Sequence, residues 1–115
     1  MKIITVIIPE YNRGEDLVAT IESLIHCDRS KFDLVVVDQT KKHSDEVLSR
    51  LAELEAEFPM KWLRGVKPNL TRARNIGLKE SSTAFVLYVD DDVLVEPDFI
   101  CQYVKAIEKL SLIHI

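Results

Sequence analysis

Three short, almost wholly apolar runs constrain the fold of this chain more than any other feature. They cover Ile3–Ile8, Phe32–Val37 and Ala84–Val89, and β-branched residues are frequent in them. A strand that is covered on both faces has this composition, whereas a half-exposed strand alternates apolar and polar residues. We therefore expect three buried strands, the first ended by Pro9, and a weaker fourth strand at Met60–Leu63.

Amphipathic helical segments separate and follow these runs. The first repeats apolar residues from Leu17 to Ile25, and the others are expected to begin at an N-cap Ser44, at an N-cap Thr71 and with Pro97 as first helical residue. Strands that alternate with helices form crossover units, in which the strands run parallel and helices cover the sheet. The chain is therefore predicted to be an α/β three-layer sandwich with a mostly parallel, Rossmann-like sheet.

Composition narrows the classes of function. The formal net charge of -4 is spread along the chain, which is not the charge pattern of a nucleic-acid-binding protein. The apolar runs are far shorter than the roughly 18 residues of a membrane-spanning helix, so no membrane span is expected. Cys27 and Cys101 are isolated, and the amino terminus does not resemble a secretion signal. We therefore expect reduced thiols and a cytoplasmic location.

Polar segments follow the three strong strand candidates directly. They are Pro9–Asn12, Asp38–Thr40 and Asp90–Asp92. In parallel α/β sheets, ligands bind outside the carboxyl ends of the strands. These three segments, which are distant in sequence, are therefore expected to meet at one site.

Asp90, Asp91 and Asp92 are the strongest chemical signal. Three adjacent carboxylates repel one another unless a positive charge lies among them. Oxygen ligands of this kind suit Mg²⁺ or Mn²⁺, which often bind together with the phosphates of a substrate. Asp90 and Asp92 form a DxD pair that could hold such an ion. The alternative is a solvated loop or a helix-capping cluster.

The other polar candidates each allow two interpretations. Asp38 either contacts a ligand or forms an Asx turn that satisfies its own backbone. The ring of Tyr11 either stacks on a base or packs against neighbouring residues. Asn12 can stabilise the conformation of the loop. Arg72 and Arg74 flank a predicted helix N-terminus, where they either bind phosphate or remain surface charges.

Four motifs occur in an order that is typical of one enzyme family. They are Val6–Arg13, Val35–Thr40, Ala73–Gly77 and Tyr88–Asp92. With these motifs, the chain up to Lys109 resembles the amino-terminal half of a family 2 glycosyltransferase of the GT-A fold, a nucleotide-diphospho-sugar transferase.

The resemblance implies a role in donor binding for each matching residue. Pro9 and Tyr11 would line the base pocket, and Asp38 would hold the nucleotide. Arg74 and Asn75 would lie near the nucleotide.

In the last motif, the resemblance implies contacts with the ribose and a metal. Asp91 would reach the ribose or the metal shell. Asp92 would ligate a divalent metal, Mn²⁺ or Mg²⁺, that bridges the two phosphates, and Asp90 would support the loop and the metal site.

The implied reaction transfers a sugar from a UDP- or dTDP-sugar to an unknown acceptor, with inversion, and the metal neutralises the leaving diphosphate. The implied setting is the biosynthesis of cell-envelope polysaccharide, with the full-length parent peripheral at the inner membrane.

Two positions depart from the family pattern. Gln39 stands where many members carry a second acid that reads the base, and Glu10 stands where a small polar residue is usual.

Domains of this family normally continue beyond the DxD motif with acceptor-binding strands and a carboxylate general base. We therefore expect residues 1–109 to be the donor-binding half of a truncated domain, able to bind a nucleotide and a metal but inactive alone. Residues 110–115 read like a translated sequencing adapter, so we expect a non-native tail there.

Two other classes of function stay open. A haloacid dehalogenase-like phosphatase carries a DxDx(T/V) pattern, which would make Asp90 the nucleophile and Asp92 the acid. That motif normally ends the first strand of its domain, whereas here it follows the last strong strand candidate. A non-catalytic nucleotide-sugar binding module would not need the missing base.

Overall fold

A computed structural model describes residues 2–113 of the chain, with side chains described up to residue 110. Strands and helices alternate throughout this part: β1 (Ile4–Glu10), α1 (Gly14–Ile25), β2 (Phe32–Asp38), α2 (Asp45–Glu57), β3 (Met60–Leu63), α3 (Leu70–Glu80), β4 (Phe85–Tyr88) and α4 (Phe99–Ile113). The strands form one sheet in the order β3-β2-β1-β4, and every described pairing is parallel. The predicted α/β fold with a parallel sheet is confirmed.

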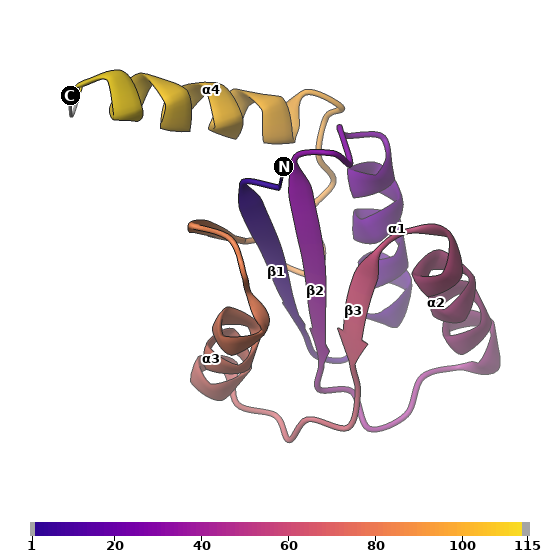
Figure 1. The fold of residues 1–115 in the computed structure, drawn as a ribbon. Helices are drawn as coiled ribbons and strands as arrows, with labels where there is room; N and C mark the ends of the chain where they lie inside the picture. Colours follow the sequence, from indigo (N-terminus) through magenta and orange to yellow (C-terminus); the bar gives the residue numbers. More distant parts are fainter. Residues whose placement is uncertain (1, 114–115) are drawn as a thin grey trace.

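The helices cover both faces of the sheet, which gives the predicted three layers (Figure 1). Because side chains alternate along a strand, Ile4, Val6 and Ile8 of β1 point into a large core built with α1, α2 and α4. Ile7 points to the opposite face, where a smaller core contains Val35 and Val37 of β2 and Ala73 of α3. The central strands are thus buried on both sides, as their composition indicates.

The prediction that the last strand is buried like the first two was wrong. Phe85 and Tyr88 in β4 are 42% and 39% exposed. In the part of the chain that the structure describes, β4 pairs with β1 alone and therefore forms an edge of the sheet. An apolar composition is compatible with an edge strand as well as with a central strand, so the sequence could not reveal that β4 lies at an edge.

The prediction that Pro9 ends the first strand was also wrong, since β1 continues through Glu10. Pro9 lies opposite Val37 in the pairing with β2. On the β4 side, the amide of Val89 donates to the carbonyl of Ile7 at 3.0 Å, and the paired register of β1 with β4 ends at Ile7. The missing N–H of Pro9 therefore faces the side where the ladder has ended, which makes proline tolerable there.

The helix starts were predicted in part. Ser44 caps α2 as predicted, because its hydroxyl accepts a hydrogen bond from the amide of Val47 at 3.2 Å. The predicted cap of α3 was wrong. Asn69, not Thr71, caps that helix, and its side-chain oxygen accepts from the amide of Arg72 at 2.9 Å.

The fourth helix begins at Phe99, later than predicted, and Pro97 is not its first residue. Pro97 and Asp98 form a turn in front of the helix. The amide of Gln102 donates to the Asp98 carbonyl at 2.9 Å, which places Asp98 at the helix boundary.

Two further sequence predictions concern the whole chain. None of the helices within the described residues is long and apolar enough to cross a membrane. Residues 110–113 of the predicted tail lie at the end of α4, and residues 114–115 lie outside the described residues, so the origin of the tail stays a prediction.

Candidate functional site

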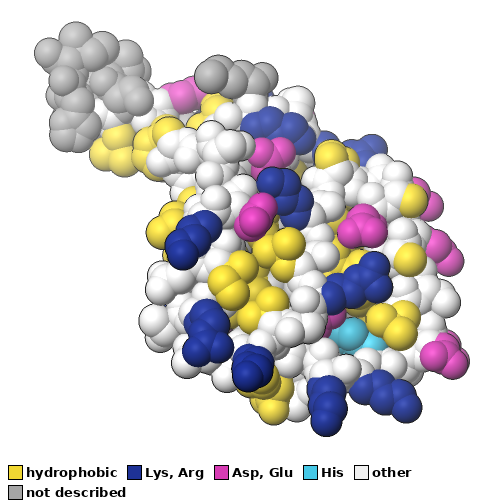
Figure 2. Space-filling view, turned by 60° about the horizontal axis from the view of Figure 1, so that its bottom comes forward, with side chains coloured by type: hydrophobic (Ala, Val, Ile, Leu, Met, Phe, Trp, Pro, Cys, Tyr) yellow, Lys and Arg dark blue, Asp and Glu magenta, His cyan; other side chains and the backbone are white. Residues whose placement is uncertain are grey.

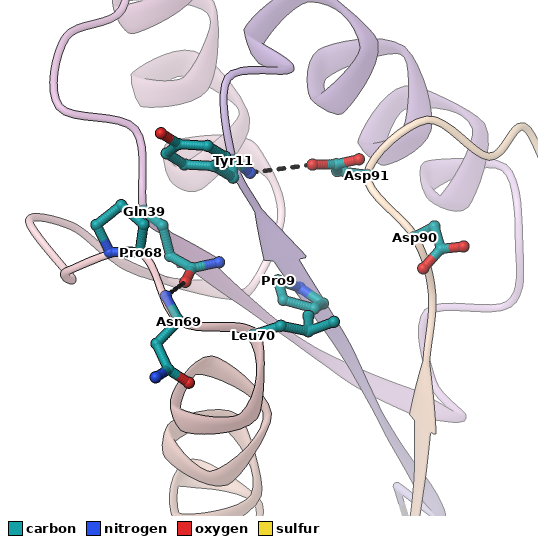
Figure 3. Close-up of a pocket in the computed structure, with 8 residues that line it drawn as sticks. All are labelled: Pro9, Tyr11, Gln39, Pro68, Asn69, Leu70, Asp90 and Asp91. Carbon is teal, nitrogen blue, oxygen red and sulfur yellow. Dashed lines mark hydrogen bonds between the residues drawn. The ribbon is translucent and has the colours of Figure 1, made fainter.

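A cavity of about 450 Å³ opens at the carboxyl ends of the strands (Figure 3). The three predicted polar segments all contribute to its wall, together with the segment that precedes α3. Its lining residues are Pro9, Tyr11, Gln39, Pro68, Asn69, Leu70, Asp90 and Asp91. The loops after β1, β2 and β4 therefore meet at one site, as expected for a parallel sheet.

A hydrogen bond joins the acidic loop to the loop after β1. The backbone amide of Tyr11 donates to Oδ2 of Asp91 at 3.0 Å (Figure 3). Burial raises the pKa of the Asp91 carboxyl above its ordinary value, although the Tyr11 amide lowers it, and the charges of Asp92 and Asp90 raise it further. The site thus holds a carboxyl group whose charged form is disfavoured first by burial and then by the neighbouring aspartates, which is common at functional positions.

The acidic loop has the donor set that a divalent cation needs. Asp90 and Asp92 are exposed, Asp91 is half-buried, and Asp90 and Asp91 line the cavity. A cation would relieve the repulsion that raises the pKa of Asp91, and carboxylate oxygens suit Mg²⁺ or Mn²⁺. The donor chemistry of this loop therefore suits such a metal.

Arg74 and Asn75 lie outside the lining of this cavity, exposed on α3. The guanidinium of Arg74 lies 5.7 Å from the centre of the Tyr88 ring on β4. Arg72 is also exposed, and its amide is already bonded to the Asn69 cap. The structure thus places these α3 side chains beside the cavity rather than in it.

A second cavity of about 650 Å³ adjoins the first and shares Tyr11, Gln39 and Pro68 with it. Lys41 and Lys67 also line it. Lys and Arg side chains, with several Asp and Glu side chains among them, lie around an apolar centre on this face of the molecule (Figure 2), although the formal net charge of the chain is -4. An anionic ligand would therefore meet cations at this edge of the sheet.

Sequence reasoning missed the contribution of the loop between β3 and α3. Pro68, Asn69 and Leu70 line the first cavity, and Gly65, Val66 and Lys67 line the second. This loop follows the carboxyl end of β3, so its position after a strand was the available signal. The weakness of the four-residue strand concealed that signal.

Next to the cavities lies a buried polar cluster, formed by Glu10, Asp38, Thr40, His43 and Trp62. Of these residues, Thr40 is half-buried and lines the second cavity. Asp38 is 2% exposed and lines neither of the two cavities. Its Oδ1 accepts from the amide of Thr40 at 3.0 Å, which is the Asx turn, one of the two interpretations that the sequence allows for Asp38. Its Oδ2 accepts from the indole N–H of Trp62 at 2.9 Å and lies 2.7 Å from Nε2 of His43.

Three members of the buried polar cluster offer atoms of the type that bind metals. The ligand atoms of Glu10, Asp38 and His43 lie within 4.8 Å of one another. However, the 2.7 Å between Nε2 of His43 and Oδ2 of Asp38 is a hydrogen-bond distance. Two ligands of one tetrahedral zinc ion lie more than about 3 Å apart. The described geometry is therefore that of a hydrogen-bonded cluster, which a metal could enter only by opening this bond.

Comparison with known proteins identifies the family of this site. The family model described as "Glycosyl transferase family 2" matches residues 5–113. The chain belongs to glycosyl transferase family 2. The resemblance drawn from the four motifs is thereby confirmed, and the phosphatase alternative is wrong because the family is one of glycosyltransferases.

Relatives and solved structures agree with this family. The poly(ribitol-phosphate) beta-N-acetylglucosaminyltransferase TarP of Staphylococcus aureus is 30% identical over 97 residues, which are 83% of this chain and 30% of TarP. The structure of S. aureus TarS 1-349 in complex with UDP-GlcNAc has a TM-score of 0.76 at 25% identity, and the match covers 95% of this chain and 32% of that one.

A more distant structure supports the fold alone. The mannosyltransferase PcManGT from Pyrobaculum calidifontis, in complex with GDP-Man and Mn²⁺, has a TM-score of 0.73 at 24% identity, covering 89% of this chain and 31% of that one. The fold is thus of the GT-A type. The chain spans about a third of the length of TarP and of the matched TarS structure.

Proposed function

We propose that this chain is the donor-binding part of a glycosyltransferase that moves a sugar from a nucleoside-diphosphate sugar to an unidentified acceptor, with a divalent metal and with inversion. The hydrogen bond from the Tyr11 amide to Asp91 carries the proposal. It joins the acidic loop to the loop after β1 around one cavity, so a base and a metal-bound diphosphate could be held together.

The lining of the two cavities supports a nucleotide as ligand. Tyr11 is 51% exposed and lines both cavities, so its ring is free to stack on a base. Lys41 and Lys67 supply positive charge for phosphate oxygens. The similarity to TarS, solved with UDP-GlcNAc, favours a uridine nucleotide.

Gln39 is compatible with a uracil-type base. Its Oε1 accepts a hydrogen bond from the amide of Asn69 at 2.7 Å. A carbonyl oxygen has two lone pairs, so one remains for the N–H of a base. Gln39 lines both cavities, so a base bound there could use this lone pair.

In this proposal, Asp92 and Asp90 hold Mn²⁺ or Mg²⁺, and Asp91 orients the loop through Tyr11. When bound, the metal supplies positive charge against the charge that develops on the leaving diphosphate. We further propose that residues 1–109 are the donor-binding half of the domain, and that the catalytic base and acceptor site belong to the remainder of the parent. The chain alone would then bind the donor without transferring its sugar.

The first test is calorimetry of UDP binding with and without Mn²⁺. We expect the metal to tighten UDP binding about tenfold or more, the equivalent of a charge-assisted contact. Asp92→Asn should remove most of that dependence. Asp33→Asn is the matched control, because Asp33 lies on β2 in a surface ion pair with Lys2 at 3.5 Å. Equal affinity with and without metal would contradict the proposed metal site.

The second test concerns the inactivity of the chain alone. Incubation with UDP-GlcNAc and Mn²⁺ should release no more sugar than Mn²⁺ without protein does. Release above that background would show that these residues contain a working base, and the proposed division of the domain would then be wrong.

A further inference from the structure

Glu10 carries an ionisable group at an unusual place, the end of the central strand β1. Its side chain is completely buried, with 0% exposure. Both carboxylate oxygens accept hydrogen bonds, Oε1 from the hydroxyl of Thr40 at 2.6 Å and Oε2 from the amide of Arg13 at 2.9 Å. A buried carboxylate persists only when it is paired in this way. Glu10 therefore points away from the cavity and into the buried polar cluster.

The contacts of Glu10 lead to the turn that carries Tyr11. Thr40, which donates to Glu10, also accepts from the amide of Asn12 at 2.7 Å. The next amide, that of Arg13, bonds Glu10 directly at the start of α1, where no side chain of Arg13 itself acts as a cap. Glu10 thus fixes both amides that follow Tyr11, one directly and one through Thr40.

This turn has a conformation that needs support. Asn12 has a φ of +55°, in the left-handed region that non-glycine residues seldom adopt. Tyr11, directly before it, lines both cavities. A small change of the backbone at Asn12 would therefore redirect Tyr11 and its amide bond to Asp91.

The main chain of Glu10 also holds the loop after β2. Its carbonyl accepts from the amide of Gln39 at 2.9 Å and from the Gln39 side chain at 3.4 Å. His43 and Trp62 hold the same loop through their hydrogen bonds with Asp38. Two of the loops that form the cavity wall, those after β1 and β2, are therefore joined at Glu10.

We propose that Glu10 is a positioning residue of the donor site, which holds the Tyr11–Asn12 turn through Thr40 and the Arg13 amide without touching the donor. This inference rests on the proposed function, because it assumes that Tyr11 meets a nucleotide. The role is geometric: it requires two hydrogen-bonding atoms at the end of the Glu10 side chain, and not a negative charge.

Two substitutions separate geometry from charge. In Glu10→Gln, the amide oxygen can accept from Arg13, and the amide nitrogen can donate to the second lone pair of the Thr40 hydroxyl. In Glu10→Ala, both contacts are lost. Glu55→Ala is the control, because Glu55 is an exposed glutamate within α2.

The first readout needs no ligand. Hydrogen exchange of the Asn12 and Arg13 amides reports the two bonds that the inference depends on. Exchange at both should accelerate in Glu10→Ala and remain slow in Glu10→Gln and Glu55→Ala. Unchanged protection in Glu10→Ala would overturn the inference, whether or not the protein binds UDP.

The second readout is the affinity for UDP with Mn²⁺, measured at a temperature at which each variant is folded. We expect a loss of about tenfold in Glu10→Ala and less than about threefold in Glu10→Gln, in keeping with one or two misplaced contacts. Wild-type affinity in Glu10→Ala would overturn the positioning role. If the wild type itself binds no UDP, the proposed function fails, and the exchange measurement still decides whether Glu10 holds the turn.

A second pair of variants covers the case in which Glu10→Ala does not fold. Thr40→Val removes the hydroxyl that links Asn12 to Glu10, whereas Thr40→Ser retains it. The Asn12 amide should exchange faster in Thr40→Val and at the wild-type rate in Thr40→Ser. Equal rates in the two variants would contradict the link through Thr40.

Discussion

At the scale of single residues, Glu10 shows how the fold changes the chemistry of a side chain. Burial raises the pKa of its carboxyl above the ordinary value of 4.5. The hydrogen bonds from Thr40 and Arg13 lower this pKa, and neighbouring Asp38 raises it further, so that the net direction is upward. A raised pKa means that the folded protein binds this proton more tightly than the unfolded chain does. This contribution to stability is fully present at pH values below the ordinary pKa, and it is lost as the pH rises through the pKa that Glu10 has in the folded protein.

The pH dependence of stability can therefore be predicted by comparison with Glu10→Gln, which resembles the protonated form at every pH. The stability of the variant relative to the wild type should increase as the pH rises above 4.5, the ordinary pKa, and through the raised pKa of the folded protein, because only the wild type must ionise a buried carboxyl. Asp38 and His43, the titratable groups that face Glu10, are the same in both proteins. Urea unfolding at several pH values measures the difference, and a difference that is constant with pH would contradict the prediction.

Which site residues could be predicted from the sequence depends on what determines their position. Pro9 lies at the carboxyl end of β1, and Tyr11, Asp90 and Asp91 come shortly after strands, so the topology of the sheet brings them to the cavity. The burial of Glu10 could not be predicted, because it depends on partners from other loops. The same limit explains why His43 received no role from the sequence.

At the scale of elements, α3 packs against the sheet through a residue without a side chain. Gly77 is buried on α3, and a Cβ atom at this position would overlap Cγ2 of Ile7 on β1. Ile7 is completely buried and β-branched, so it cannot easily turn aside. The close contact sets how near α3, with Asn69 and Leu70 at its start, approaches the cavity.

We expect Gly77→Ala to destabilise the protein even though alanine favours helices. Overpacking costs about 1–3 kcal/mol and the gain in helix propensity is about 1 kcal/mol, so a severe overlap should leave a net loss near 2 kcal/mol. Lys79→Ala, at an exposed position of the same helix, should change the stability by less than about 0.5 kcal/mol. Urea unfolding compares the two, and a neutral or stabilising Gly77→Ala would contradict the packing argument.

The existence of each element was predictable, the strands from apolar runs and the helices from periodicity, but the boundaries of the elements and their places in the sheet were not. Thr71 and Asn69 are both good N-cap residues, and which one caps α3 is decided by the loop from β3, whose Asn69 amide is held by Gln39. Likewise, β4 has the composition of a central strand and lies at an edge. Local composition does not specify the neighbours of an element.

At the scale of the whole molecule, the two edges of the described sheet differ. On β3, Lys61 is exposed and lies 3.3 Å from Glu80 of α3, so this edge carries charge. On β4, the exposed side chains include Phe85 and Tyr88, and Leu94 in the following segment is 71% exposed. Charged residues discourage pairing between edge strands, whereas an apolar edge permits it.

We therefore expect copies of this chain to associate through β4. An unpaired, apolar edge strand can accept a strand from a second molecule, which buries apolar surface and satisfies backbone groups. Sedimentation velocity over a roughly hundredfold range of concentration should show a growing share of dimers or larger species. Phe85→Lys places a charge on this edge and should reduce the association, whereas Leu110→Lys, at an exposed position of α4, should not. A single monomeric species at every concentration, or equal effects of the two substitutions, would show that the β4 edge does not drive self-association.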